Sequence, residues 1–148
     1  MSLSETSKMY LAKAGWDSSR RVDISLYVEG LQAEGYEVSS CAREFLTQFG
    51  GLELLQPAFR VKNKLDKLHF KPLIASTDIF REKVQSYEER VYEPLVVVGE
   101  AYNGYLTLMI SETGKVYGGY DSFLTFLGSD YTEALDSLFL CRKTPEIK

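Results

Sequence analysis

Apolar side chains in the first third of the chain recur at the i, i+3, i+4 and i+7 positions that share one face of a helix. The pattern predicts three helices, over residues 4–14, 23–35 and 39–50, with a glycine at the end of each. Polar residues stand where the second and third helices need N-caps: Asp23, Ser39 and Ser40. The first third is therefore expected to be helical.

Segment 44–52 is expected to join the third helix to a strand. Phe45 and Phe49 share one helical face. The pair Gly50–Gly51 supplies the left-handed backbone conformation that ends a helix without steric cost. Leu52 then begins a new apolar run, so we predict an aromatic pair buried just before the turn.

The middle of the chain changes to a β pattern. Residues 52–61 predict one strand, and an interruption at Pro57 suits an edge position in a sheet. Residues 67–71 are the expected antiparallel partner, reached through a turn at 63–66.

Two further helices are expected in the second half. Polar residues at 76–78 cap a helix whose apolar stripe has the 3.6-residue period: Phe80, Val84, Tyr87 and Val91. Residues 131–141 predict the last helix, with an inward apolar face: Ala134, Leu135, Leu138 and Phe139. Its polar residues are assigned to the solvent face: Asp130, Glu133, Asp136 and Ser137.

The clearest β signal is the β-branched run 95–98, which is typical of a central strand buried on both faces. Strands at 105–110 and 115–120 follow through Asn-Gly and Thr-Gly turns and complete a three-stranded meander. Strands and helices do not alternate regularly, which argues against a parallel sheet. We therefore expect a single domain over 1–148, an α+β fold whose antiparallel sheet has helices packed around it.

Charge is distributed unevenly. The net charge of −4 argues against non-specific nucleic-acid binding, which needs a basic face. Residues 60–71 have a local charge of +4, whereas residues 72–148 carry 12 acidic and 7 basic residues. These charges either serve solubility or prepare the acidic half for a basic partner.

The cysteines and the apolar runs indicate the compartment. Cys41 and Cys141 lie far apart and form no Cys-x-x-Cys motif, so we expect two half-buried thiols. Residues 1–15 lack the apolar core of a signal peptide, and the longest apolar stretch, 94–98, is too short to span a membrane. The expected location is the cytoplasm.

Motifs for catalysis or cofactor binding are scarce. His69 is the single histidine, so it is a poor candidate for a metal ligand or a base and is expected to be structural or on the surface. Residues 113–116 lack the first glycine and the Ser or Thr of a phosphate-binding loop, and they suit a hairpin turn. We expect no catalytic residues, no cofactor and no metal.

Four motifs run in order along nearly the whole chain, at 11–23, 45–52, 94–99 and 110–117. Gly-Trp followed by Arg-Arg marks the first, and Phe-Gly-Gly-Leu closes the second. In this ordered set the chain resembles the third subfamily of the SUKH superfamily of immunity proteins, although it lacks the more usual proline near Asp17–Ser18.

The resemblance implies a bacterial protein, encoded beside a toxin, that binds and neutralises this toxin in the producing cell. Toxins of this superfamily are often nucleases, so the implied partner is the C-terminal domain of a cognate toxin with a basic surface. The contact residues differ with each toxin, so none can be transferred by motif. A regulatory scaffold that binds a cellular signalling partner is the alternative, and an enzyme that uses a carboxylate pair comes third.

Acidic and aromatic residues of the second half are the candidate toxin contacts. Carboxylates would steer a basic partner, and tyrosines would act as rigid anchors. The candidates are Glu88, Glu89, Glu93, Tyr117, Tyr120, Asp121, Asp130 and Glu133. Core packing is the competing interpretation for the tyrosines, and also for Trp16.

Overall fold

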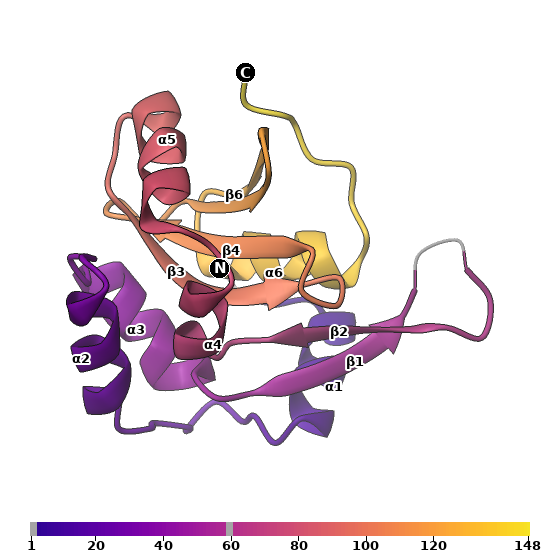
Figure 1. Ribbon diagram of the computed structural model, residues 1–148. Coiled ribbons are helices and arrows are strands. Elements are labelled where there is room, and N and C mark those ends of the chain that lie inside the picture. Colours follow the sequence, from indigo (N-terminus) through magenta and orange to yellow (C-terminus); the bar gives the residue numbers. More distant parts are fainter. Residues whose placement is uncertain (1–2, 59–60) are drawn as a thin grey trace.

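The computed structural model describes residues 3–58 and 61–148, and within them the chain forms six helices and six strands (Figure 1). The helices are α1 (Glu5–Lys13), α2 (Ser25–Ala33), α3 (Ser40–Phe49), α4 (Pro72–Thr77), α5 (Arg81–Val91) and α6 (Tyr131–Phe139). The strands are β1 (Glu53–Pro57), β2 (Leu65–His69), β3 (Leu95–Ala101), β4 (Leu106–Ser111), β5 (Val116–Tyr120) and β6 (Phe123–Gly128).

All six strands form one antiparallel sheet in the order in which they occur in the chain. This confirms the predicted α+β class. Every residue of β3 is buried, as its β-branched run indicated, and Pro57 ends the outer strand β1.

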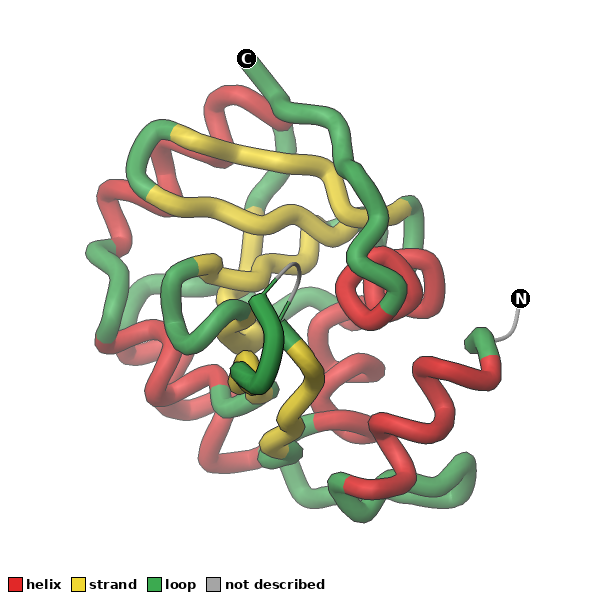
Figure 2. Tube along the Cα trace, turned by 90° about the vertical axis from the view of Figure 1, so that its right-hand side faces the viewer, coloured by secondary structure: helices red, strands yellow, loops and turns green. Residues whose placement is uncertain are grey.

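Helices cover the sheet on both sides (Figure 2). On one face, Val116 of β5 shares a small internal space with Phe45 of α3 and Leu135 of α6. On the other, a Cβ atom added at Gly119 would lie 2.6 Å from the ring of Tyr87 of α5. Because side chains alternate along a strand, α5 packs on the opposite face from α3 and α6.

The joint between α3 and β1 is built as predicted, with one correction. The Phe49 ring stacks on Trp16 at 5.7 Å between centroids and meets the Phe45 ring at 5.0 Å. Only Gly51 has a left-handed backbone, with φ of +88°, whereas Gly50 has φ of −55°. Gly50 is needed for space instead, since a Cβ there would lie 2.5 Å from the Leu46 carbonyl oxygen.

Two elements were not predicted. Residues 72–77 form the separate helix α4, because Pro72 suits the first turn of a helix. Strand β6 pairs with β5 on one side, and the Phe126 N–H donates to the Pro145 carbonyl on the other, at 3.0 Å. The C-terminal segment thus covers the outer edge of the sheet.

Several predicted boundaries were wrong. Helix α5 starts at Arg81, and Phe80 is its exposed N-cap rather than part of the buried stripe. Helix α2 starts at Ser25, because the Asp23 carboxylate accepts from the backbone N–H of Ser25 at 2.9 Å and forms a turn before the helix. The strand predicted over 52–61 ends at Pro57, and residues 59–60 lie outside the described residues.

The predicted solvent face of the last helix was also wrong in part. Asp136 and Ser137 are buried. The Asp136 carboxylate accepts from the Ser7 hydroxyl at 2.5 Å, and the Ser137 hydroxyl donates to the Leu127 carbonyl at 2.8 Å. Helix α1 and strand β6 therefore cover a face that local patterning assigned to water.

Candidate functional site

Three of the candidate acids lie together at the C-terminal end of α5. Glu88, Glu89 and Glu93 line one shallow surface depression with Tyr92. Tyr92 ends the helix in a left-handed conformation, with φ of +62°, and the residue is 92% exposed. A left-handed backbone costs a residue with a side chain roughly 1–2 kcal/mol. We call these four residues the acidic end of α5.

The three carboxylates differ in how they are held. Glu88 pairs with Arg81 at 3.3 Å and accepts from the Leu95 backbone N–H at 2.7 Å, so it also anchors the start of β3. Burial opposes the ionisation of Glu93, but hydrogen bonds from Thr113 outweigh it and hold the pKa of Glu93 below its ordinary value. Glu89 is exposed and makes no ion pair among residues 3–58 and 61–148.

Tyr120 and Asp121 lie at the turn between β5 and β6, which is tied to α5. The Tyr87 hydroxyl donates to the Asp121 carbonyl at 2.6 Å, and Arg90 Nη1 donates to the Ser122 carbonyl at 2.9 Å. Tyr120 and Asp121 are both exposed. The turn and the acidic end are therefore held by the same helix.

Three predicted contact residues do not join this surface. Tyr117 is only 5% exposed and packs on Phe126, with ring centroids 5.7 Å apart, so we remove it from the candidate contacts. Asp130 caps α6 by accepting from the Glu133 N–H at 2.9 Å, and Glu133 accepts in return from the Ser129 N–H at 3.2 Å. This pair stabilises the start of a helix on the other face of the sheet.

Sequence reasoning missed several exposed aromatic residues near Tyr120. The ring centroid of Tyr105 lies 6.1 Å from that of Tyr120, and Phe123 pairs with Tyr120 across the β5–β6 turn. Phe80 lines a second depression that also contacts Tyr105 and Tyr120. Tyr105 directly follows the predicted Asn103–Gly104 turn, and an aromatic residue there was the available signal, because turn residues are usually polar.

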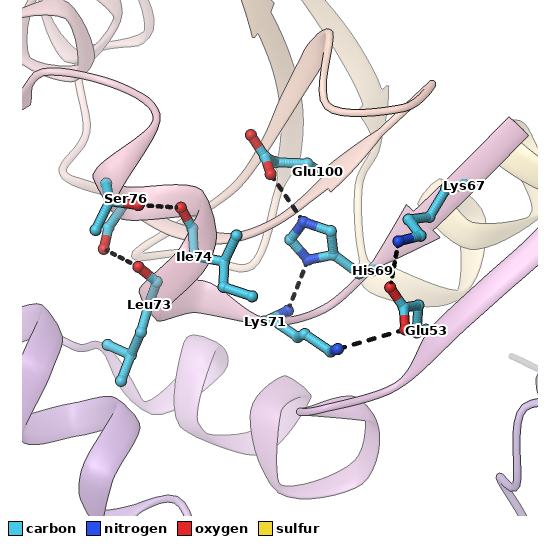
Figure 3. A network of polar contacts seen from close by, with 9 residues as sticks. Glu53, Lys67, His69, Lys71, Leu73, Ile74, Ser76 and Glu100 are labelled. Atoms are coloured by element: carbon cyan, nitrogen blue, oxygen red, sulfur yellow. Dashed lines mark hydrogen bonds and ion pairs between the residues drawn. The ribbon is translucent and has the colours of Figure 1, made fainter.

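The single histidine lies in a buried polar network at the junction of β2 and β3 (Figure 3). His69 Nε2 lies 2.8 Å from Glu100 Oε1, and His69 Nδ1 accepts from the Lys71 backbone N–H at 3.0 Å. That bond places the ring proton on Nε2, which donates to Glu100. On the exposed side, Glu53 pairs with Lys67 at 2.7 Å and with Lys71 at 3.4 Å.

Burial dominates the acid–base properties of this network. It raises the pKa of Glu100 to about 7, with a further contribution from nearby Asp78. It also lowers the pKa of His69, and the charge of Lys71 acts in the same direction. Within residues 3–58 and 61–148, no three His, Cys, Asp or Glu side chains are grouped so that they could hold a metal ion. The network joins two parts of the sheet, which is a structural role.

The sequence profile of the SUKH-3 immunity protein family matches residues 3–140 of the chain. Searches of curated proteins and of solved structures give no significant match. In the part of the chain that the structure describes, no helix has the length and apolar character needed to cross a membrane.

Proposed function

Because the chain belongs to the SUKH-3 immunity protein family, we propose that it neutralises a nuclease toxin by occupying the toxin's nucleic-acid-binding groove. Family membership supports the immunity role and implies a cognate toxin as the partner. The nuclease activity of the toxin, inhibition by occlusion without turnover, and action in the cytoplasm are parts of the proposal.

The acidic end of α5 is the single observation that carries this proposal. It gathers Glu88, Glu89 and Glu93 around one depression, and among the described residues no Lys or Arg lines it. A groove that binds nucleic acid is lined with Lys and Arg, which neutralise phosphates. Carboxylates held on a rigid helix end would meet the same cations and so keep the nucleic acid out.

Charge and aromatic contact have separate tasks in such a complex. Charge complementarity mainly accelerates association and fixes orientation, whereas a few buried aromatic residues contribute most of the affinity. Tyr92 stands among the three carboxylates with nearly all of its side chain exposed. We propose Tyr92 as the anchor of the acidic end.

The test uses the purified C-terminal domain of the cognate toxin. The variants tested are Glu89→Lys and Asp121→Asn, because neither side chain makes a hydrogen bond among the described residues. Asn also tolerates the left-handed backbone at position 121, where φ is +50°. Glu29→Lys on α2 is the matched control, since it makes the same charge change on an exposed residue outside the depression.

We expect Glu89→Lys to slow association with the toxin by about 10-fold or more at low salt and to weaken its salt dependence. Glu29→Lys should leave both unchanged. The wild-type protein should also displace a labelled oligonucleotide from the toxin in fluorescence anisotropy. A toxin without nuclease activity, or a complex that still binds nucleic acid, would contradict the proposal.

A further inference from the structure

An apolar pocket opens at the end of the sheet where β4, β5 and β6 meet the C-terminal segment. Its volume is about 410 Å³. Leu106, Leu127 and Leu138 line its interior, and all three are buried. The rim consists of three exposed aromatic residues, Tyr105 (67% exposed), Tyr120 (48%) and Phe123 (40%).

Pairing in the sheet builds this rim. Tyr120 and Phe123 face each other across the β5–β6 turn, so both side chains lie on the same face of the sheet. Gly118, also on that face, leaves the space that Leu106 fills, because a Cβ there would lie 2.7 Å from a Leu106 methyl carbon. The pocket is thus a product of the strand register.

Hydrogen bonds hold the opposite wall in place. Thr144 lies on this wall, and its hydroxyl is 2.6 Å from the Thr125 hydroxyl of β6. The Ile147 N–H donates to the Leu124 carbonyl at 2.7 Å. The pocket therefore exists before any partner binds, and a preformed site spares a partner the cost of ordering it.

Size and lining restrict what the pocket can hold. An apolar cavity of about 150 Å³ is enough to bind benzene. The pocket could therefore take one aromatic or long aliphatic side chain together with part of the backbone that carries it. The Arg142 side chain on the wall, and the tyrosine hydroxyls, could meet carbonyl groups of that backbone.

The neighbourhood of the pocket points to the occupant. A second depression shares Tyr105 and Tyr120 with it and adds Asp78 and Asp121 against Lys83, a net negative border. Bonds from Tyr87 and Arg90 of α5 hold the Asp121–Ser122 turn, so the rim and the acidic end of α5 are attached to one helix. A basic protein is therefore attracted to the border of the pocket as well as to the acidic end of α5.

We infer that this pocket receives one bulky apolar side chain of the toxin, carried next to a Lys or Arg that meets Asp121. The inference rests on the proposed function for the identity of the partner. The acidic end then governs how fast the toxin associates, and the pocket governs how long it stays bound.

Binding kinetics of single variants with the toxin's C-terminal domain test this inference. Tyr105→Ala and Phe123→Ala truncate exposed rim residues, and Leu26→Ala, on exposed Leu26 of α2, is the matched apolar control. Truncating an anchor residue that costs at least 2 kcal/mol of binding free energy weakens binding about 30-fold or more. We expect both rim variants to show this weakening as faster dissociation. Their salt dependence, melting temperature and far-ultraviolet circular dichroism should stay unchanged. Leu26→Ala should bind like the wild type.

The outcomes separate this inference from the proposed function. Rim variants that bind like the wild type overturn the pocket inference, even if Glu89→Lys still slows association. Rim variants that bind weakly while Glu89→Lys binds normally uphold the pocket and reject the acidic end. A dimer of the isolated protein in light scattering that Tyr105→Ala abolishes would assign the pocket to a second copy and overturn the inference.

Discussion

His69 Nε2 donates a hydrogen bond of 2.8 Å to Glu100 Oε1 at the one residue pair through which β2 joins β3. His69 and Glu100 are the register pair that joins the β1–β2 hairpin to the β3–β6 meander, and both side chains are buried. A Cβ at the neighbouring Gly99 would lie 2.1 Å from the His69 carbonyl oxygen, so the two strands need a glycine there.

Glu100→Gln should remove a loss of folding stability that the wild-type protein shows as the pH rises through about 7. Burial raises the pKa of folded Glu100 to about 7, so the folded state holds this proton more tightly than the unfolded state. The contribution of Glu100 to the free energy of unfolding is therefore largest below the unfolded pKa of about 4.3 and is lost as the pH rises through about 7. Burial lowers the pKa of His69, so the contribution of His69 to stability is lost as the pH falls, in the wild type and in the variant.

Thermal unfolding at about pH 5 and about pH 8 measures this effect. Glutamine keeps an oxygen that can accept from His69 Nε2 but removes the buried charge. We expect Glu100→Gln to gain stability relative to the wild type at the higher pH. An equal difference at both pH values would show that Glu100 does not titrate between them.

Asp136→Asn should loosen the N-terminal helix. The Asp136 carboxylate accepts from the Ser7 hydroxyl at 2.5 Å and from the Ser4 N–H at 3.1 Å, which fastens α1 to α6. Burial raises the pKa of Asp136, but the bonds from Ser7 and Ser4 outweigh it, so the net shift is downward. Its stabilisation is therefore present above the unfolded pKa of about 3.9 and is lost as the pH falls below it.

Urea unfolding at neutral pH should show a loss of about 1–3 kcal/mol for Asp136→Asn. Ser7→Ala is the partner variant, and the double variant should lose less than the sum of the two single losses, because both remove the same bond. Additive losses would mean that the bond contributes no coupling.

Gly50→Ala should destabilise the α3–β1 joint more than Gly51→Ala. A Cβ at Gly50 would strike the Leu46 backbone oxygen at 2.5 Å and the Tyr27 ring at 2.9 Å. Such overpacking costs roughly 1–3 kcal/mol. Gly51 has a left-handed backbone, so alanine there costs roughly 1–2 kcal/mol. The nearest atom to a Cβ at Gly51, the Tyr27 hydroxyl, is 3.0 Å away, so steric overlap is smaller than at Gly50. Melting temperatures in the reverse order would contradict this account.

Tyr92→Gly should separate stability from binding. Glycine adopts the left-handed backbone of position 92 without strain, but it adds freedom to the unfolded chain. We therefore expect the free energy of unfolding to change by no more than about 1 kcal/mol. Removing the exposed ring should nevertheless weaken toxin binding. Calorimetric titration measures the affinity, and Tyr92→Phe, which keeps the ring, is the control. Wild-type affinity of Tyr92→Gly would remove Tyr92 from the proposed anchors.

Much of the fold could be predicted from local pattern. The β-branched run 95–98 and the three N-terminal helices follow from periodicity and glycine stops, and the structure contains each of them. Strand β6 was missed because its six residues form a short apolar run without a strong period of their own, and pairing on both sides defines it. Asp136 was misplaced because its partners, Ser4 and Ser7, are more than 120 residues away in the chain.

The sequence by itself determined the α+β class, the resemblance to SUKH immunity proteins and the excess of acids in the second half. Only the tertiary structure decided which of these residues share a surface. Tyr117 and Tyr120 lie three residues apart on β5 and therefore face opposite sides of the sheet, and packing buried one while the other stayed exposed. Local spacing encodes an element, whereas burial depends on contacts between elements that are distant in the chain.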